Sequence, residues 1–266
     1  MKPYLSALRV RFLSGLQYRA AALGGLATQF FWGIMAVFIY EVFYSSGGQP
    51  MLSFHQLVTY IWLQQAFLAL IMLYDWDYEL FDMITSGNLS YELCRPCRLY
   101  WLWYVKLLSK RLAGATMRFS PIILTAILLP PKYRLGLPQS PAAFFMFVVT
   151  LFFGVLLLVS ISMLIYISVF KTLSPVGSMA FVGILGEFFS GMTLPVPLMP
   201  DWLQKICYIL PFRWTADLPL RIYSGNIGLS EAVLSLGVQL AWIGILAGAG
   251  WALMERVSRK AVLQGG

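Results

Sequence analysis

The sequence predicts an all-α, polytopic membrane protein with six transmembrane helices in a single domain, residues 1–266. Its composition is the first observation behind this prediction: 59% of the residues are hydrophobic and 11% are charged, whereas roughly 25% are charged in an ordinary soluble domain. The second is that apolar residues come in uncharged runs of about 20, the length of helix that crosses a hydrocarbon core about 30 Å thick. The third is an uneven distribution of lysine and arginine along the chain.

The first predicted element is an amphipathic helix over residues 1–19. Apolar side chains recur there at helical spacing among basic ones, at Leu5, Leu8, Phe12 and Leu16. We expect this helix to lie on the inner leaflet, where its basic residues meet anionic lipid. The alternative is a basic leader that only sets the orientation. No apolar stretch with a cleavage site precedes the first span, so no cleavable signal peptide is expected.

Charge-free runs define the predicted spans. Four are clear: Ala20 to Tyr40, Gln56 to Tyr74, Ala142 to Phe170, and Ala232 to Met254. A fifth, Thr172 to Pro195, is apolar apart from Glu187. The sixth, Leu112 to Pro131, contains Arg118 and Pro121 and follows three closely spaced basic residues, which can snorkel toward the headgroups.

The basic residues orient these spans. If six spans alternate with the amino terminus inside, 14 of the 19 lysines and arginines lie on the cytoplasmic side. The outer side keeps Lys132, Arg134, Lys205, Arg213 and Arg221. The positive-inside rule therefore places both termini in the cytoplasm. It also accounts for most of the net charge of +8, so we expect no nucleic-acid partner.

A short motif raises the question of ATP binding. Ser45 to Gln49 contains SGGQ, the core of the signature with which ABC-type ATPases grip a nucleotide phosphate. Here the motif falls in a short outer loop and is followed by Pro50, whereas phosphate recognition needs a helix amino terminus in a soluble domain. No phosphate loop of the form GxxxxGK[ST] is present either, so we interpret Gly47 and Gly48 as a turn.

Other reactive residues are sparse. Cys94 and Cys97 have CxxC spacing but lie on the reducing cytoplasmic side, without the second pair that a zinc site would need. His55 is the only histidine, so a catalytic triad would depend on it, and no GxSxG motif accompanies it. We therefore predict no catalytic residues, no metal site and no cofactor.

The connection between the second and third predicted spans, residues 75–110, differs from the rest of the chain. Acidic and aromatic residues alternate before a turn at Ser86-Gly87-Asn88, and a second short stretch ends at Arg95-Pro96. This pattern predicts two short amphipathic helices separated at Gly87. They would present charges to a soluble partner; the alternative is that the aromatics only anchor the loop at the headgroups.

Three stretches resemble a known family, the membrane subunits of type-2 ABC exporters. They are SGNLSYELCRPCRLYWLW (Ser86 to Trp103), GMTLPVPLMPDWLQKICYILPFRW (Gly191 to Trp214) and ADLPLRIYSG (Ala216 to Gly225). The resemblance implies a coupling helix that docks on a separate ATPase subunit. It also implies an outer re-entrant hairpin after the fifth span, over residues 194–225, with Trp202, Trp214 and Tyr223 as interfacial anchors.

The resemblance also implies partners and contact residues. An ABC ATPase, as two copies or a pair, would bind the segment that holds Asp82, Thr85, Ser86, Gly87, Leu89, Tyr91, Arg95 and Pro96. A second permease, identical or related, would complete the transport route, and membrane lipids would surround both. The expected location is the inner membrane of a bacterium.

Intramembrane polar residues are candidates for the substrate pathway. A carboxylate within an apolar helix is costly and usually functional, so Glu187 is the first candidate. It could instead pair with Arg118, Gln64 or Gln65 as a structural contact. Gln29, Gln64 and Gln65 complete the predicted pathway set.

The resulting hypothesis is a permease that moves an amphipathic, lipid-like or drug-like molecule outward, powered by the partner ATPase and without bond chemistry of its own. One alternative is an ion-coupled secondary transporter in which Glu187 carries the proton; it predicts repeated, paired helix breaks. Another is a membrane-embedded enzyme, which would need clustered reactive side chains.

Overall fold

The computed structural model describes residues 2–17, 19–47 and 51–259, except for the side chains of residues 19–22 and 91. All regular structure in these ranges is helical, which confirms the all-α prediction. Four helices are long and apolar enough to cross a membrane: α2 (Arg19–Ser45, counted from Leu23), α7 (Leu99–Leu128), α8 (Pro141–Thr172) and α12 (Leu229–Ser258). The predicted count of six such helices is therefore not confirmed.

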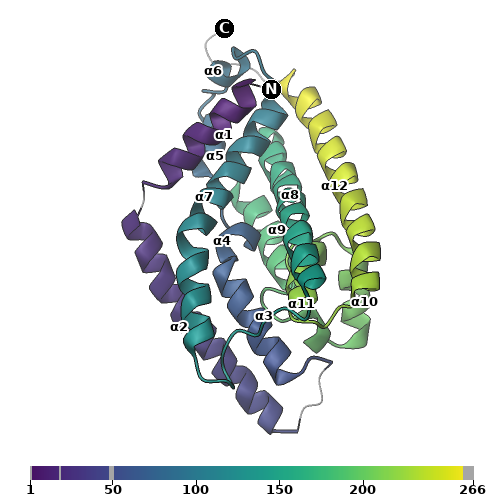
Figure 1. Ribbon diagram of the computed structural model, residues 1–266. Helices are drawn as coiled ribbons and strands as arrows, with labels where there is room; N and C mark the ends of the chain where they lie inside the picture. The colour runs from purple at the N-terminus through teal and green to yellow at the C-terminus, as the bar shows by residue number, and fades with distance from the viewer. Residues whose placement is uncertain (1, 18, 48–50, 260–266) are drawn as a thin grey trace.

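Shorter helices fill the space between them. They are α1 (Lys2–Gly15), α3 (Phe54–Ala66), α4 (Leu68–Ile71), α5 (Tyr78–Thr85), α6 (Ser90–Leu93), α9 (Val176–Phe189), α10 (Asp201–Ile209) and α11 (Asp217–Tyr223), with single 3₁₀ turns at Val196–Leu198 and Phe212–Trp214. The start of α1 and the end of α12 lie at the same end of the bundle as α5 and α6 (Figure 1).

Helix α8 is the centre of the bundle. Much of its length is buried, and it packs on α12, α11, α7 and α5. Ser140 caps its first turn by accepting a hydrogen bond from the Ala143 N–H at 3.1 Å, and Pro141 fits the first helical position, where no N–H is needed. At Gly154 the helix approaches the chain closely, because a Cβ there would lie 2.5 Å from the Thr215 carbonyl oxygen.

The second predicted span is broken. The predicted run from Gln56 to Tyr74 forms α3 up to Ala66, a junction at Phe67 and the single turn α4, after which Met72 is extended. The prediction of one continuous helix was wrong because hydropathy measures only the apolar character of a run. Hydropathy does not show where side chains from other parts of the chain form hydrogen bonds with the backbone groups that a helix break leaves unpaired.

The fifth predicted span is also shorter than expected. Helix α9 ends at Phe189 after 14 residues, which is about 21 Å of helix against a core of about 30 Å. The chain then turns at Gly191, whose φ of 82° favours glycine. The following short helices occupy the end of the bundle opposite α5 and α6 (Figure 1).

Two other predicted boundaries change. Helix α7 begins at Leu99, so the last twelve residues of the predicted loop 75–110 are helical. The weakly predicted span Leu112–Pro131 forms the second part of this longer helix, which ends at Leu128. Helix α1 packs along α7, with Tyr4 and Ala7 against the core. Leu5, predicted to lie in the apolar stripe, is 65% exposed.

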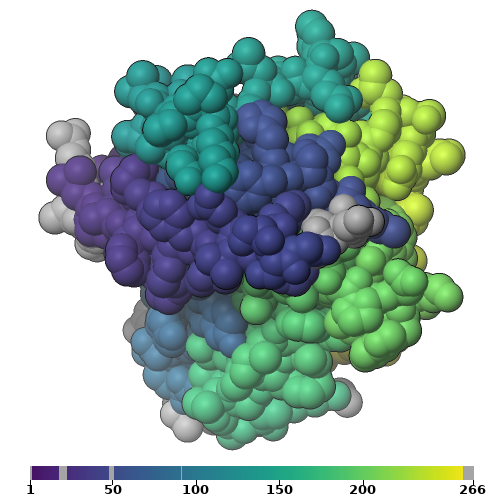
Figure 2. Space-filling model, turned by 90° about the horizontal axis from the view of Figure 1, so that it is seen from below, coloured from purple at the N-terminus to yellow at the C-terminus, as the bar shows by residue number. Residues whose placement is uncertain are grey.

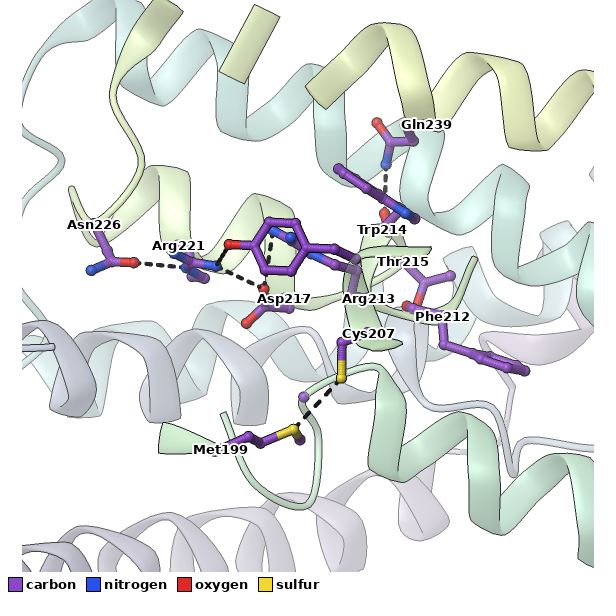
Figure 3. Close-up of polar contacts among 12 residues, drawn as sticks. Met199, Cys207, Phe212, Arg213, Trp214, Thr215, Asp217, Arg221, Asn226 and Gln239 are labelled. Carbon is purple, nitrogen blue, oxygen red and sulfur yellow. Dashed lines mark hydrogen bonds and ion pairs between the residues drawn. The ribbon is translucent and has the colours of Figure 1, made fainter. Parts of the chain in front are cut away.

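Buried charges hold residues 212–226 in the bundle (Figure 3). Asp217 lies between two arginines, with its carboxylate 3.6 Å from Arg213 and 3.4 Å from Arg221. The Nε of Arg221 donates to Asn226 at 2.7 Å, and the Gln239 amide of α12 donates to the Trp214 carbonyl at 2.7 Å. Arg213 and Arg221 are thus internal residues rather than charges of an open loop.

This cluster corrects the predicted interfacial anchors. Trp202 is exposed, as an anchor would be, but Trp214 and Tyr223 are buried. Tyr223 packs on Phe147 of α8 with ring centroids 5.1 Å apart. Aromatic residues near a membrane boundary pack inward when a short helix such as α11 is enclosed by its neighbours.

Candidate functional site

Helix α5 has one buried face and one exposed face. The Asp77 carboxylate caps its amino terminus by accepting a hydrogen bond from the Glu79 N–H at 3.2 Å. Leu80, Phe81 and Ile84 face inward, and the Phe81 ring stacks on Tyr166 of α8 at 4.3 Å. The exposed face carries Tyr78, Glu79, Asp82 and Thr85.

Helix α6 is fastened to α7 by a buried ion pair. Glu92 is 4% exposed, and one of its oxygens accepts from the Lys106 ammonium at 2.9 Å. The other oxygen lies 3.4 Å from Arg95, which is itself exposed. Removing one partner of such a pair leaves the other charge buried and unpaired, so the pair fixes the position of α6.

Two more basic residues of α7 hold the chain between α4 and α5. Lys110 donates to the Trp76 carbonyl at 2.5 Å and pairs with Asp75 at 2.8 Å. Arg111, 1% exposed, donates to the Met72 carbonyl at 2.6 Å and to the Leu70 carbonyl at 3.4 Å. The sequence predicted that these basic residues snorkel toward headgroups; instead they bind residues 70–92.

Helix α1 completes this framework. Arg11 donates to Glu79 at 2.6 Å and lies 3.6 Å from Asp77. The Leu8 carbonyl accepts from the Ser109 hydroxyl of α7 at 2.7 Å. A displacement of α5, together with α6 and residues 75–77, therefore acts directly on α1, α7 and α8.

The predicted partner-contact residues differ in their exposure. Most of them are exposed: Asp82, Thr85, Ser86, Arg95 and Pro96. Gly87 is half-buried in the turn between α5 and α6, with φ at 77°, so the two short helices are separated where the sequence predicted. Leu89 was predicted to be a contact residue, but it is 3% exposed and belongs to the core. The side chain of Tyr91 lies outside the described residues.

Glu187 binds the broken helix end. Its carboxylate accepts a hydrogen bond from the Leu73 N–H at 2.5 Å, close to the carbonyls that Arg111 binds. Glu187 lies two residues before the end of α9, whereas the sequence predicted a position in the middle of a span. Its alternative predicted partners, Arg118, Gln64 and Gln65, make no hydrogen bond with it.

The three glutamines predicted to line the substrate pathway lie around the same cavity. Gln29, Gln64 and Gln65 line one cavity of about 460 Å³ between α2, α3 and residues 192–195, and Glu187 does not line it. All of its lining residues are uncharged. Figure 2 shows the purple helix α2 beside the green segment that follows α9.

Gln29 differs from Gln64 in this cavity. It is 3% exposed, and neither its amide oxygen nor its amide nitrogen has a hydrogen-bond partner among the described residues. The Gln64 amide, by contrast, donates to the Met192 carbonyl at 2.5 Å. A buried donor and a buried acceptor beside this uncharged cavity are therefore without a protein partner.

Comparison with known families agrees with this architecture. Residues 98–222, from the end of the α6–α7 turn into α11, match the family model of the ABC-2 type transporter. The chain contains an ABC-2 type transporter domain. This match, which covers somewhat less than half of the chain, supports a membrane permease of the ABC type. No match was found among curated proteins.

Proposed function

We propose that this ABC-2 permease is the membrane subunit of an ATP-driven exporter, and that α5 and α6 form its docking surface for a separate ABC ATPase. The supporting observation is the way this surface is built. Its outer face is polar and exposed, whereas its inner face is fixed to α1, α7 and α8 by packing and by the pairs of Glu92, Lys110 and Arg11. A partner that moves this surface therefore moves the bundle.

The proposed movement reaches the centre of the protein through the helix break. Residues 72–77 connect α5 to α4, and Arg111 and Glu187 hold the broken end from α7 and α9. ATP binding by the partner would shift this junction between two arrangements. The two arrangements would differ in affinity for the substrate, which is the only way in which the partner can drive transport.

The amide cavity is the proposed substrate route. Its uncharged lining and the free amide of Gln29 suit an amphipathic molecule whose polar part is neutral. We propose that the molecule enters from the inner leaflet and leaves outward, that a second permease closes the route, and that the complex lies in a bacterial inner membrane with both termini cytoplasmic.

The test measures docking and hydrolysis together. The permease is purified with the ABC ATPase encoded beside it, and vanadate-sensitive ATP hydrolysis is measured for the Asp82→Ala/Thr85→Ala double variant. We expect hydrolysis and co-purification to fall about tenfold, because two exposed contact residues in a docking surface contribute about 1–2 kcal/mol. The matched control is Lys205→Ala, an exposed change on α10 at the opposite end.

Each possible result of this experiment either supports or contradicts the proposed docking surface. Normal thermal stability with weakened ATPase binding supports the docking surface. If the double variant binds and stimulates the ATPase as well as the unchanged protein does, α5 is not the docking surface. If no ATPase associates with the unchanged protein, the proposed function is wrong.

A further inference from the structure

The wall of the amide cavity between α2 and α3 combines neutral polar side chains with aromatic ones. Helix α2 contributes Gln29, Trp32 and Tyr40, and α3 contributes Gln64 and Gln65. The volume of about 460 Å³ falls within the range of about 300–1,000 Å³ that is usual for sites of small ligands. Because all the lining residues are uncharged, the wall offers no ionic partner to a phosphate, a carboxylate or an ammonium group.

Several polar groups around this cavity have no protein partner. The buried amide of Gln29 is without a hydrogen bond at either end. The side chains of Gln65, Tyr40 and Thr193, which also line the cavity, form no hydrogen bond among the described residues. The Gln64 amide, in contrast, donates to a backbone carbonyl. The protein thus leaves four neutral polar side chains unpaired around one cavity.

The chemistry of these four side chains restricts the ligand. Two are amides and two are hydroxyls, so each of them both donates and accepts hydrogen bonds. A matching ligand is neutral and carries several groups that also both donate and accept. The hydroxyl groups of a sugar ring meet this condition. The ester oxygens of a simple lipid only accept, and a phosphate headgroup brings a charge that finds no partner here.

The aromatic residues of α2 suit the other face of a sugar ring. Trp32 and Tyr40 line the cavity eight residues apart, which is about 12 Å along the helix axis, with the small Ala36 between them. The face of an aromatic ring carries negative potential, so it attracts the weakly positive C–H groups of a sugar. One wall of the cavity therefore offers hydrogen bonds and aromatic faces together.

The position of the cavity leaves a path for an apolar chain. Helix α2 lies at the edge of the bundle (Figure 1). Next to the cavity-lining residues it carries apolar side chains that no other part of the protein covers, including Phe31 at 63% and Ile39 at 58% exposure. Such a surface suits contact with hydrocarbon. A molecule whose polar end lies in the cavity can thus keep its apolar chain in the membrane.

We propose that the molecule carried through the amide cavity is a glycolipid with an uncharged sugar headgroup. Its hydroxyl groups bond to Gln65 and Thr193, and its ring packs on Trp32. Gln29 lines the cavity, so rotation about its side-chain bonds brings its unpaired amide to the sugar. This inference rests on the proposed function, because it names the class of substrate for the proposed route.

The test is native mass spectrometry of the permease without its ATPase, in a polyoxyethylene detergent that contains no sugar. The probes are monoglucosyl dioleoylglycerol, dioleoylglycerol and dioleoyl phosphatidylglycerol, which share their acyl chains. We expect one monoglucosyl lipid to be retained per chain, about tenfold in preference to each of the other two. Equal retention of the three lipids, or a preference for phosphatidylglycerol, would overturn the proposal.

Variants separate sugar binding from a structural role of the amides. Gln65→Leu removes one amide at similar volume and should lower the preference about tenfold. Gln29→Leu should also lower it, yet raise the unfolding temperature, because a buried amide without a partner is costly. Trp32→Leu should weaken binding, whereas Trp202→Leu, an exposed tryptophan outside the cavity, is the matched control. A preference unchanged in both glutamine variants would contradict the assignment.

A second measurement separates this inference from the proposed function. Vanadate-sensitive ATP hydrolysis by the permease–ATPase complex should rise with monoglucosyl dioleoylglycerol and not with dioleoylglycerol, since a transported substrate binds the two arrangements differently. A complex that forms normally but does not respond to the glycolipid overturns the substrate class and leaves the docking surface intact. If no complex forms, the proposed function fails even where the isolated permease retains the glycolipid.

Discussion

Arg111 and Glu187 show how single residues make a broken span tolerable. Backbone groups that lose their helical partners need others inside a membrane. Arg111 binds the carbonyls of Leu70 and Met72, and Glu187 binds the N–H of Leu73. The carboxylate thus serves as a hydrogen-bond acceptor for the backbone, which gives it a role other than carrying a proton.

Glu187→Gln distinguishes these two roles. An amide oxygen still accepts the Leu73 N–H bond, so we expect the variant to fold and to transport, with a loss of stability of about 1–2 kcal/mol for the missing charge near Arg111. Glu187→Ala should cost more, because the N–H is left without its partner. Transport and unfolding temperature are measured for both; complete loss of transport in Glu187→Gln with a normal unfolding temperature would support the ion-coupled alternative instead.

Asp217 is the second residue whose removal should be costly. It is fully buried and is the shared partner of Arg213 and Arg221. Asp217→Ala leaves two buried guanidinium groups uncompensated, so we expect a loss of about 3–5 kcal/mol. Arg213→Met should cost less, because Asp217 keeps Arg221 and Met fills a similar volume. Thermal unfolding in detergent measures both; an equal or larger loss for Arg213→Met would contradict this assignment of the shared charge.

Among the elements, α6 depends most on a single contact. Glu92→Gln breaks the buried pair with Lys106, so we expect amide hydrogens of residues 88–97 to exchange at least tenfold faster while α8 stays protected. The matched control is Glu255→Gln, which breaks the exposed pair with Arg259 and should cost less than about 1 kcal/mol. Unchanged exchange in residues 88–97 would show that the pair does not hold α6.

The same elements show what the sequence could predict. The turn at Gly87 and the apolar spacing of α5 are local, and both short helices were predictable from them. The partner of Lys106 was not predictable, because it depends on how α6 packs against α7. The burial of Leu89 was not predictable for the same reason. The long uncharged helices were predictable from hydropathy, but α3–α4 and α9 were not, since their breaks are compensated by residues far along the chain.

The bundle as a whole has two distinct ends. The start of α1, the end of α12 and α5 lie at one end, and the loop between α7 and α8 lies at the other (Figure 1). We expect Asn88→Cys and Arg134→Cys to react with a membrane-impermeant thiol reagent from opposite sides, in a background where Cys94, Cys97 and Cys207 are replaced by serine. Labelling of both positions from the same side would contradict this topology.

The proposed coupling depends above all on contact between the exposed face of α5 and an ABC ATPase. It is tested most directly by placing a photo-crosslinking amino acid at Asp82, with a matched substitution at Lys205 on α10 as the distant control, in membranes that contain the candidate ATPase. We expect a crosslinked permease–ATPase product from position 82 and none from position 205. Crosslinking from position 205 but not from position 82, or from neither, would contradict it.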